Sequence, residues 1–190
     1  MQYLKITAVL FVLALSAACA SGPPKPIHVD EMKEPGVGLI YGQLRMPNED
    51  WNHVKLVMIQ RVGKVYGGMG LKGLSEKVHI TRDGRYVAAN LKPGKYMLAG
   101  FVIGSENNFL GKNALNYTVE VKAGGLHYLG TYKYVITKAG NMIRPGSFDL
   151  VQDETRASHV ELLNWVEEGV RATKWHGPIK RKLAGLQGGK

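Results

Sequence analysis

The stretch from Gly38 to Gln152 is built of short runs rich in valine, isoleucine, tyrosine and threonine, with turn residues between them. These residue types are typical of strands, because branched and aromatic side chains pack well on a pleated surface. The runs are GLIYGQLR, VKLVMIQ, KVHITR, RYVAANL, KYMLAGFVI, LNYTVEV and LHYLGTYKYVITK. Strands at this spacing predict a mainly β fold, an antiparallel β-sandwich of approximately seven strands.

Two dipeptides predict turns inside this stretch. Asp83-Gly84 suits a two-residue hairpin because glycine accepts a positive φ, and Pro93-Gly94 suits a turn because proline fixes φ. The run KYMLAGFVI is apolar on both faces, which is typical of a central strand. The run NYTVEVK alternates instead, which predicts one buried face and one exposed face.

The periodicity becomes helical after residue 152, in a basic segment that extends over residues 153–190. Ser158 and Glu161 have the spacing of a capping box, and apolar residues then recur on one face as in an amphipathic helix. Pro178 predicts the start of a second short helix, because proline is favoured at the first helical position. We therefore expect a short helical appendage after the sandwich.

This basic amphipathic tail is the candidate partner-binding element. Its apolar stripe could dock into a groove of a partner protein, or its cations could contact anionic lipid. Alternatively, both helices fold back on the sandwich and cover a sheet edge, which would leave the charges as a solvated face. The candidate partner-binding residues are Leu162, Trp165, Val166, Trp175, Lys180, Arg181 and Lys182.

The N-terminus has the layout of a secretory signal peptide over residues 1–18. Lys5 precedes an apolar run of roughly a dozen residues, which is too short to span a membrane and ends in small residues. The sequence LSAAC at residues 15–19 resembles the lipobox of bacterial lipoprotein precursors. In that family the peptidase cuts before the cysteine, whose thiol and new amino group carry acyl chains such as palmitate. The alternative is an ordinary signal peptide followed by an unrelated cysteine.

Cys19 is the single cysteine of the chain, so it has no partner for an internal disulfide. Lipidation would give it a role, and several acyl chains on one residue give lasting attachment to a membrane. No aspartate follows Cys19 as an inner-membrane retention signal, so the resemblance implies the outer membrane, on the periplasmic side. Residues 19–37, which are rich in proline, are predicted to form an extended tether.

The segment VHITRDGRYVAANLKPGKYMLAGF, with the opening strand GLIYGQL and the closing VEVKAGG, resembles the carboxypeptidase regulatory-like module, a transthyretin-like β-sandwich. In that module an Asp-Gly turn leads to an aromatic strand, an N-L-x-P-G-x-Y turn and a long central strand. The resemblance covers roughly residues 38–135 and places a sandwich domain at residues 38–152. It implies a fold and says almost nothing about function, because such modules occur in many exported proteins.

The sequence offers no clear pattern for catalysis, a metal or a cofactor. It contains no G-x-S-x-G nucleophile elbow, and its six histidines lack metal-ligand spacing. The glycines 67, 68, 70 and 73 include a formal G-x-G-x-x-G, but strand-like sequence follows where a nucleotide site needs a helix. Gly67, Gly68, Gly70 and Gly73 are therefore a candidate ligand loop, and we expect a non-enzymatic protein without cofactor or metal.

The net charge of +10 admits nucleic acid, anionic lipid or an acidic protein as a partner. Export and anchoring argue against nucleic acid and favour the membrane, through lipidated Cys19, together with an envelope protein. The predicted function is an outer-membrane lipoprotein that acts as a non-enzymatic periplasmic binding or scaffold module. Alternatives are a secretion-complex or other envelope component of the small transthyretin-like lipoprotein type, and a carbohydrate-binding or hydrolase accessory protein, in which Trp51 and Tyr66 could stack on sugars.

Overall fold

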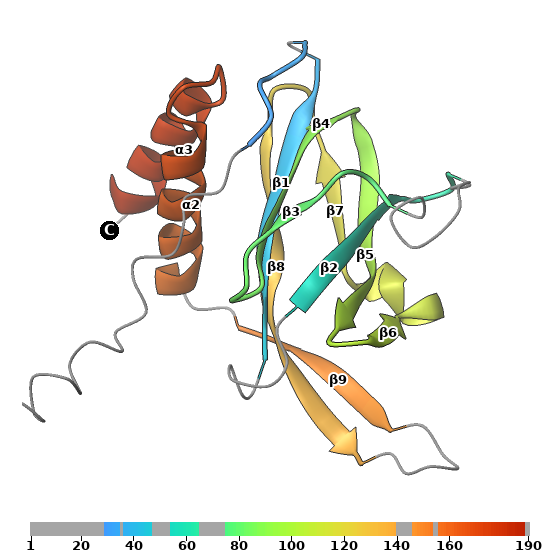
Figure 1. Cartoon of the computed structure of the whole chain (residues 1–190). Helices are drawn as coiled ribbons and strands as arrows, with labels where there is room; N and C mark the ends of the chain where they lie inside the picture. Colours follow the sequence, from blue (N-terminus) through green and yellow to red (C-terminus); the bar gives the residue numbers. More distant parts are fainter. Residues whose placement is uncertain are drawn as a thin grey trace, which may run out of the picture.

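The computed structural model describes residues 29–34, 36–46, 54–64, 75–139, 146–153 and 156–188, with side chains from residue 159 onward in the last range. Within these ranges the chain forms two β-sheets and a pair of helices that lies beside one of them (Figure 1). The predicted mainly β fold with a short helical part after it is therefore confirmed. The predicted signal peptide, Cys19 and the glycine loop lie outside the described residues.

The five-stranded sheet has the order β3-β4-β1-β8-β9, and the second sheet is centred on β5. In the second sheet, β2 pairs with one side of β5, while β6 and β7 share its other side. β5 is thus a central strand, as its apolar sequence predicts. The elements are β1 (Gly38–Arg45), β2 (Val54–Arg61), β3 (His79–Ile80), β4 (Arg85–Leu91), β5 (Gly94–Ile103), β6 (Glu106–Phe109), the 3-10 helix η3 (Gly111–Asn116), β7 (Thr118–Val121), β8 (Leu126–Lys138) and β9 (Ser147–Gln152).

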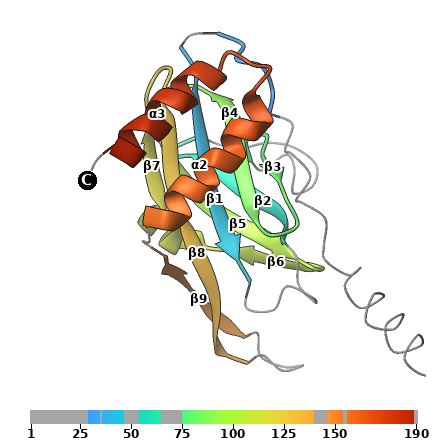
Figure 2. The ribbon, with the colours of Figure 1, turned by 90° about the vertical axis from the view of Figure 1, so that its left-hand side faces the viewer.

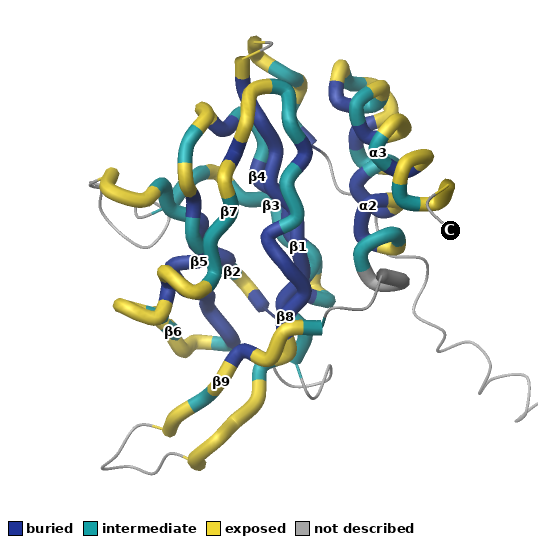
Figure 3. The backbone as a smooth tube through the Cα atoms, turned by 180° about the vertical axis from the view of Figure 1, so that it is seen from behind, coloured by how far each residue is buried: buried dark blue, intermediate teal, exposed yellow. Residues whose placement is uncertain are grey.

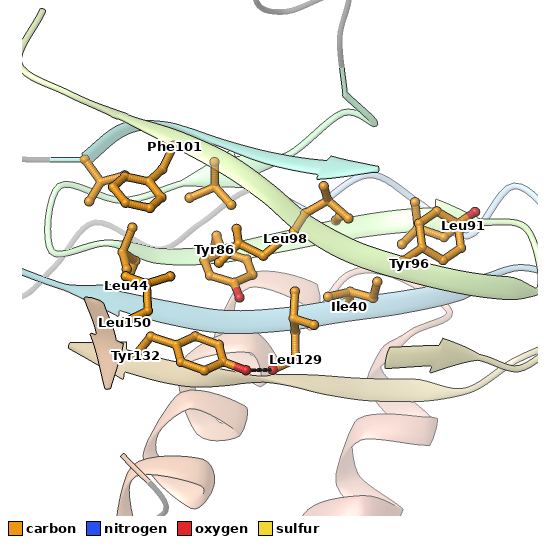
Figure 4. Packing of buried hydrophobic residues seen from close by; sticks show 14 of the residues in the cluster. Ile40, Leu44, Tyr86, Leu91, Tyr96, Leu98, Phe101, Leu129, Tyr132 and Leu150 are labelled. Carbon is orange, nitrogen blue, oxygen red and sulfur yellow. Dashed lines mark hydrogen bonds between the residues drawn. The ribbon is translucent and has the colours of Figure 1, made fainter. Parts of the chain in front are cut away.

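The main core lies between the two sheets (Figure 4). Ile40 and Tyr86 from the five-stranded sheet and Phe101 from β5 are all fully buried in this one cluster. Each such side chain contributes about 1.5–3 kcal/mol by leaving water. The alternation of strand side chains supplies this apolar face from each sheet.

A second cluster lies on the opposite face of the five-stranded sheet, under α2 (Arg156–Val170) and α3 (His176–Gly188) (Figures 1 and 2). It joins the apolar faces of the helices to Leu39 and Tyr41 of β1 and Val87 of β4. The helices therefore cover a sheet face rather than a sheet edge. The predicted tail is an integral layer of the fold and not a separate appendage.

One strand pair departs from the predicted antiparallel arrangement. β1 and β8 run parallel, with Leu39 opposite Leu126 and Arg45 opposite Lys133. Parallel neighbours need a long connection between them, and here the chain from β2 to β7 supplies it. The apolar pattern of each strand carries no sign of its direction relative to a partner, so the sequence could not predict this pair.

The number of strands also differs from the prediction. Neither β6 nor β9 is among the predicted strands. The sequence of β6 is ENNF, and glutamate and asparagine are depleted in strands. Each of the two is a short strand held by a longer neighbour, β6 by β5 and β9 by β8.

The Asp83-Gly84 turn is longer than the predicted two-residue hairpin. The Thr81 N–H donates to Arg85 O at 2.9 Å, and the Gly84 N–H donates to Thr81 O at 3.0 Å. Residues 82–84 thus form a three-residue loop. Gly84 has a φ of +79°, the left-handed conformation that such loops require at this position.

The predicted tether extends to residue 37, but the folded part begins earlier. Val29 and Val37 are buried in the second cluster, beside the helices. Asn90 of β4 holds the segment between them, since its Nδ2 donates to Glu31 O at 2.9 Å and its Oδ1 accepts from the Lys33 N–H at 2.8 Å. The described residues of the predicted tether, 29–34, 36 and 37, therefore belong to the fold.

The predicted capping box is wrong. α2 begins at Arg156, so Ser158 lies inside its first turn instead of preceding it. Glu161 binds another element, because its Oε1 lies 2.7 Å from Arg85 Nη2 of β4. The carboxylate thus ties α2 to the sheet.

Candidate functional site

The apolar residues of the predicted partner-binding set lie inside the molecule. Leu162, Trp165, Val166 and Trp175 are all buried in the second cluster, against the five-stranded sheet. The stripe on the helices therefore packs on the chain's own sheet and is not a docking surface in this structure. The location of these four residues agrees with the alternative in which the helices fold back on the sheets. The helices cover a sheet face, whereas that alternative expected a sheet edge.

The cations of the predicted set have a different location. Lys180 and Arg181 are exposed on α3, whereas Lys182 is half-buried and its Nζ donates to Leu126 O of β8 at 3.1 Å. The structure therefore does not bring the seven predicted residues into one accessible patch. It divides them into a buried apolar face and a basic outer surface.

Polar contacts fix the helical layer to the sheet. His159 Nε2 of α2 lies 2.6 Å from the Tyr41 hydroxyl of β1. Burial, and to a lesser extent the charge of Lys182, lower the pKa of His159. Burial also raises the pKa of Tyr41 well above its usual range. Both groups are therefore neutral near pH 7, and the contact is a hydrogen bond between uncharged side chains.

A surface that the sequence did not indicate is formed by the ends of β8 and β9. We call residues 132–138 of β8 and 147–152 of β9 the β8–β9 arm. The strands pair with Tyr134 opposite Leu150 and Ile136 opposite Phe148. In Figures 1 and 3 the arm extends beyond the rest of the two sheets and away from the helices, with a largely exposed far end.

An aromatic cluster sets the direction of the arm. Phe101 of β5 lies 5.9 Å from Tyr134 and 5.5 Å from Phe148 between ring centroids, in edge-on contacts. The rings of Tyr134 and Phe148 stack at 5.0 Å. Aromatic pairs in these geometries add about 0.5–1.5 kcal/mol beyond the area that they bury. The base of the arm is thus fastened to the second sheet.

On either side of this cluster along the arm, large apolar side chains are exposed. Val135 is 41% exposed, Ile136 59% and Val151 50%. Val135 and Val151 are on one face, where their cross-strand neighbours are Asp149 and Lys133, while Ile136 is on the other face. β9 is the last strand of its sheet, so its outer edge has no strand partner in the described part of the chain. The arm combines an open edge with apolar side chains on both faces.

The sequence did not predict the arm because SFDLVQ is short and half of its residues are polar. The available signal was the long run that became β8, since a 13-residue strand is longer than the usual length of about 3–10 residues. An extended strand of that length needs a neighbour on at least one side.

Among the described residues, no group of histidine, cysteine, aspartate and glutamate is arranged to hold a metal ion. The helices of the described region are too short or too polar to cross a membrane. Comparisons of the chain with protein-family models, with curated proteins and with solved structures find no match.

Proposed function

We propose that the chain is an outer-membrane lipoprotein that serves on the periplasmic side as a non-enzymatic binding or scaffold module. In this proposal Cys19 carries the lipid after removal of residues 1–18, and the sandwich is a transthyretin-like module of the carboxypeptidase regulatory-like type. The sequence motifs at residues 15–19 and 38–135 support these two parts. The lipid would then be joined to the first described residue, Val29, by a ten-residue stretch, which can span at most about 35 Å.

The observation that carries the binding role is the β8–β9 arm. We propose that an extended segment of another envelope protein adds to the outer edge of β9 as a further strand. Main-chain hydrogen bonds would supply affinity in this mode, and side chains on the two faces would supply specificity. Val151 and Ile136 offer an apolar contact on each face.

Charge favours an acidic partner over a second copy of this chain. Lys133 and Lys138 are exposed on the arm, against the single carboxylate of Asp149. The whole chain has a net charge of +10, so two copies repel each other on approach. The expected partner segment is therefore an apolar strand flanked by acidic residues. A component of a secretion complex would use the same docking mode, with another protein of that complex as its partner.

Photo-crosslinking in intact cells tests the arm. A photoreactive residue is placed at Val151 and, in a matched chain, at Lys180 on the outer surface of α3. The proposal expects one envelope protein to be crosslinked from position 151 and not from position 180, and the crosslink to disappear when Ile136→Lys is added. Equal crosslinking from both positions, or none from position 151, contradicts it.

Labelling with radioactive palmitate tests the anchor separately. The wild-type chain should take up the label and sediment with outer membranes, whereas Cys19→Ser should lose both properties. Membrane sedimentation of Cys19→Ser at the wild-type level would refute the lipid anchor and leave the arm proposal standing.

A further inference from the structure

A cleft with a volume of about 520 Å³ lies where the turn between β7 and β8 meets α3. These two elements lie beside each other in Figure 2. Ligand sites for small organic molecules have volumes in this range. Its lining comprises Glu120, Lys122, Ala123, Gly124, Gly125, Leu126 and His127 from the sheet side, and Pro178, Arg181 and Lys182 from α3.

The cleft has an excess of positive charge. Lys122, Arg181 and Lys182 line it, against one carboxylate, that of Glu120. Lys182 is fixed in place by its hydrogen bond to Leu126 O. Within the described ranges, the side chains of Lys122 and Arg181 form no ion pair. Two cations from different elements therefore line the same space, and neither is in an ion pair with a described residue.

The wall beside these cations is rigid. His127 Nε2 accepts a hydrogen bond from the Lys122 N–H at 2.9 Å. A side chain at Gly125 would collide with the His127 ring, so glycine allows the ring to lie against the turn. Burial is the main cause that lowers the pKa of His127, and the charges of Lys182 and Lys122 lower it further. The imidazole is thus a neutral, well-placed reporter of any charge that enters the cleft.

We propose that this cleft binds the phosphate group of a phosphate ester. A dianion matches several converging cations better than a carboxylate does, and the planar guanidinium of Arg181 can bind two phosphate oxygens at once. Glu120 repels a second anionic group, so the rest of the ligand carries hydroxyl or amino donors. A soluble phosphate monoester and the monoester headgroup of phosphatidic acid share this chemistry. The inference concerns a different surface from the β8–β9 arm and does not depend on the proposed function.

The test uses the full chain in a non-ionic detergent, with sn-glycerol 3-phosphate as the probe. Binding is followed by calorimetry and by the imidazole NMR signals of His127, whose pKa should rise because an anion favours its protonated form. Arg181→Gln is expected to weaken binding roughly tenfold, the size of one lost charge-assisted hydrogen bond. Lys180→Gln is the matched control, because it removes the same charge from the neighbouring position outside the cleft.

Dihexanoyl phosphatidic acid, a soluble short-chain lipid whose headgroup is a phosphate monoester, distinguishes the two sources. Binding at least tenfold tighter than that of glycerol 3-phosphate assigns the cleft to a lipid headgroup, and equal binding assigns it to a soluble ester. The inference is overturned if neither probe shifts the His127 signals at about 10 mM, a concentration that would reveal even millimolar affinity. It is also overturned if Lys180→Gln weakens binding as much as Arg181→Gln. Both positions are exposed, so the variants are expected to fold.

Discussion

His159 and Tyr128 stack across the boundary between α2 and β8, with ring centroids 4.3 Å apart and ring planes inclined by 11°. Because His159 also contacts Tyr41 of β1, one imidazole connects the helical layer to both strands of the parallel pair. The protonation state of this ring therefore affects how well the helices hold to the sheet.

We predict that acidification weakens the fold through His159. Its pKa is lowered in the folded state, so the neutral ring contributes its full stability above pH 6.5, the ordinary histidine value, and loses it as the pH falls through the folded pKa. Lys182 adds a positive charge nearby, which opposes protonation further. His159→Phe should be less stable than wild type near pH 7, because Tyr41 loses its partner.

Urea unfolding between pH 8 and pH 5 measures this effect. The difference in unfolding free energy between the wild-type chain and His159→Phe should shrink as the pH falls below about 6.5. His127 titrates in the same direction in both chains, so its contribution cancels in the difference. A difference that stays constant over this range contradicts the prediction.

Trp175→Ala should destabilise the whole molecule rather than the helices alone. Trp175 is fully buried in the cluster that also contains Leu39 and Tyr41 of β1. Truncation of a buried tryptophan costs about 3–5 kcal/mol. Circular dichroism should show one cooperative transition at lower urea concentration, with helix and strand signals lost together.

Lys174→Ala is the control for this substitution, because the neighbouring side chain is exposed and its backbone N–H keeps its bond to Glu31. It should leave the midpoint within about 0.5 kcal/mol of wild type. Separate loss of the helix signal in Trp175→Ala, with the strand transition unmoved, would show that the helices are an independent unit after all.

Asn90 should control the segment that leads into β1. It has a φ of +62°, a left-handed conformation that costs a non-glycine residue energy, and its side chain makes both hydrogen bonds to residues 31 and 33. Asn90→Ala keeps the strain and loses the bonds, whereas Asn90→Gly loses the bonds but also relieves the strain. We expect losses of about 2–3 kcal/mol for alanine and about 1–2 kcal/mol for glycine.

The rate of trypsin cleavage after Lys33 measures directly how firmly Asn90 holds this segment. Both variants should be cut there faster than wild type, since the clamp on the segment is gone. Equal stability of the alanine and glycine variants would exclude a contribution from backbone strain, and unchanged cleavage would exclude the clamp.

Gly42 and Gly185 should respond to alanine with opposite signs. A Cβ at Gly42 of β1 would collide with the Tyr86 side chain and lie 2.6 Å from Gly130 O, so Gly42→Ala forces two strands apart. Overpacking of this kind costs about 1–3 kcal/mol. Gly185 lies in α3 with open space around it, so Gly185→Ala should stabilise the helix by about 0.5–1 kcal/mol. Thermal unfolding of the two variants checks both signs, and a stabilised Gly42→Ala would contradict the strand packing.

The sequence predicted the parts of the fold that depend on local pattern. RYVAANL and LHYLGTYKYVITK are strands over the predicted residues, because their composition and flanking turns mark both ends. The apolar stripe of α2 was equally predictable from the sequence, since Leu162 and Val166 are spaced as on one face of a helix. The pattern could not predict which surface the stripe packs against. A buried face and a docking face have the same periodicity, and only the position of the sheet distinguishes them.

The site was predicted less well for the same reason. Arg181 and Lys182 look equivalent in sequence, yet one is exposed and the other bonds a carbonyl of β8. Lys122 and His127 lie far from them in the chain, and the β7–β8 turn has to meet α3 before the cleft exists. Such long-range contacts depend on the topology of the fold. That topology includes the parallel β1–β8 pair, which no local sequence signal predicts.

β1 has one face in each core, with Ile40 between the sheets and Leu39 under the helices. It is the first described strand of the chain, but its parallel partner starts at Leu126 and its helical cover only at Arg156. In an incompletely folded chain the apolar faces of β1 therefore stay exposed until these distant segments pack on them. Contacts between residues so distant in sequence form slowly. The residues of α2 and α3 thus protect the first described strand, and a chain truncated before α2 would expose that strand to aggregation and proteolysis.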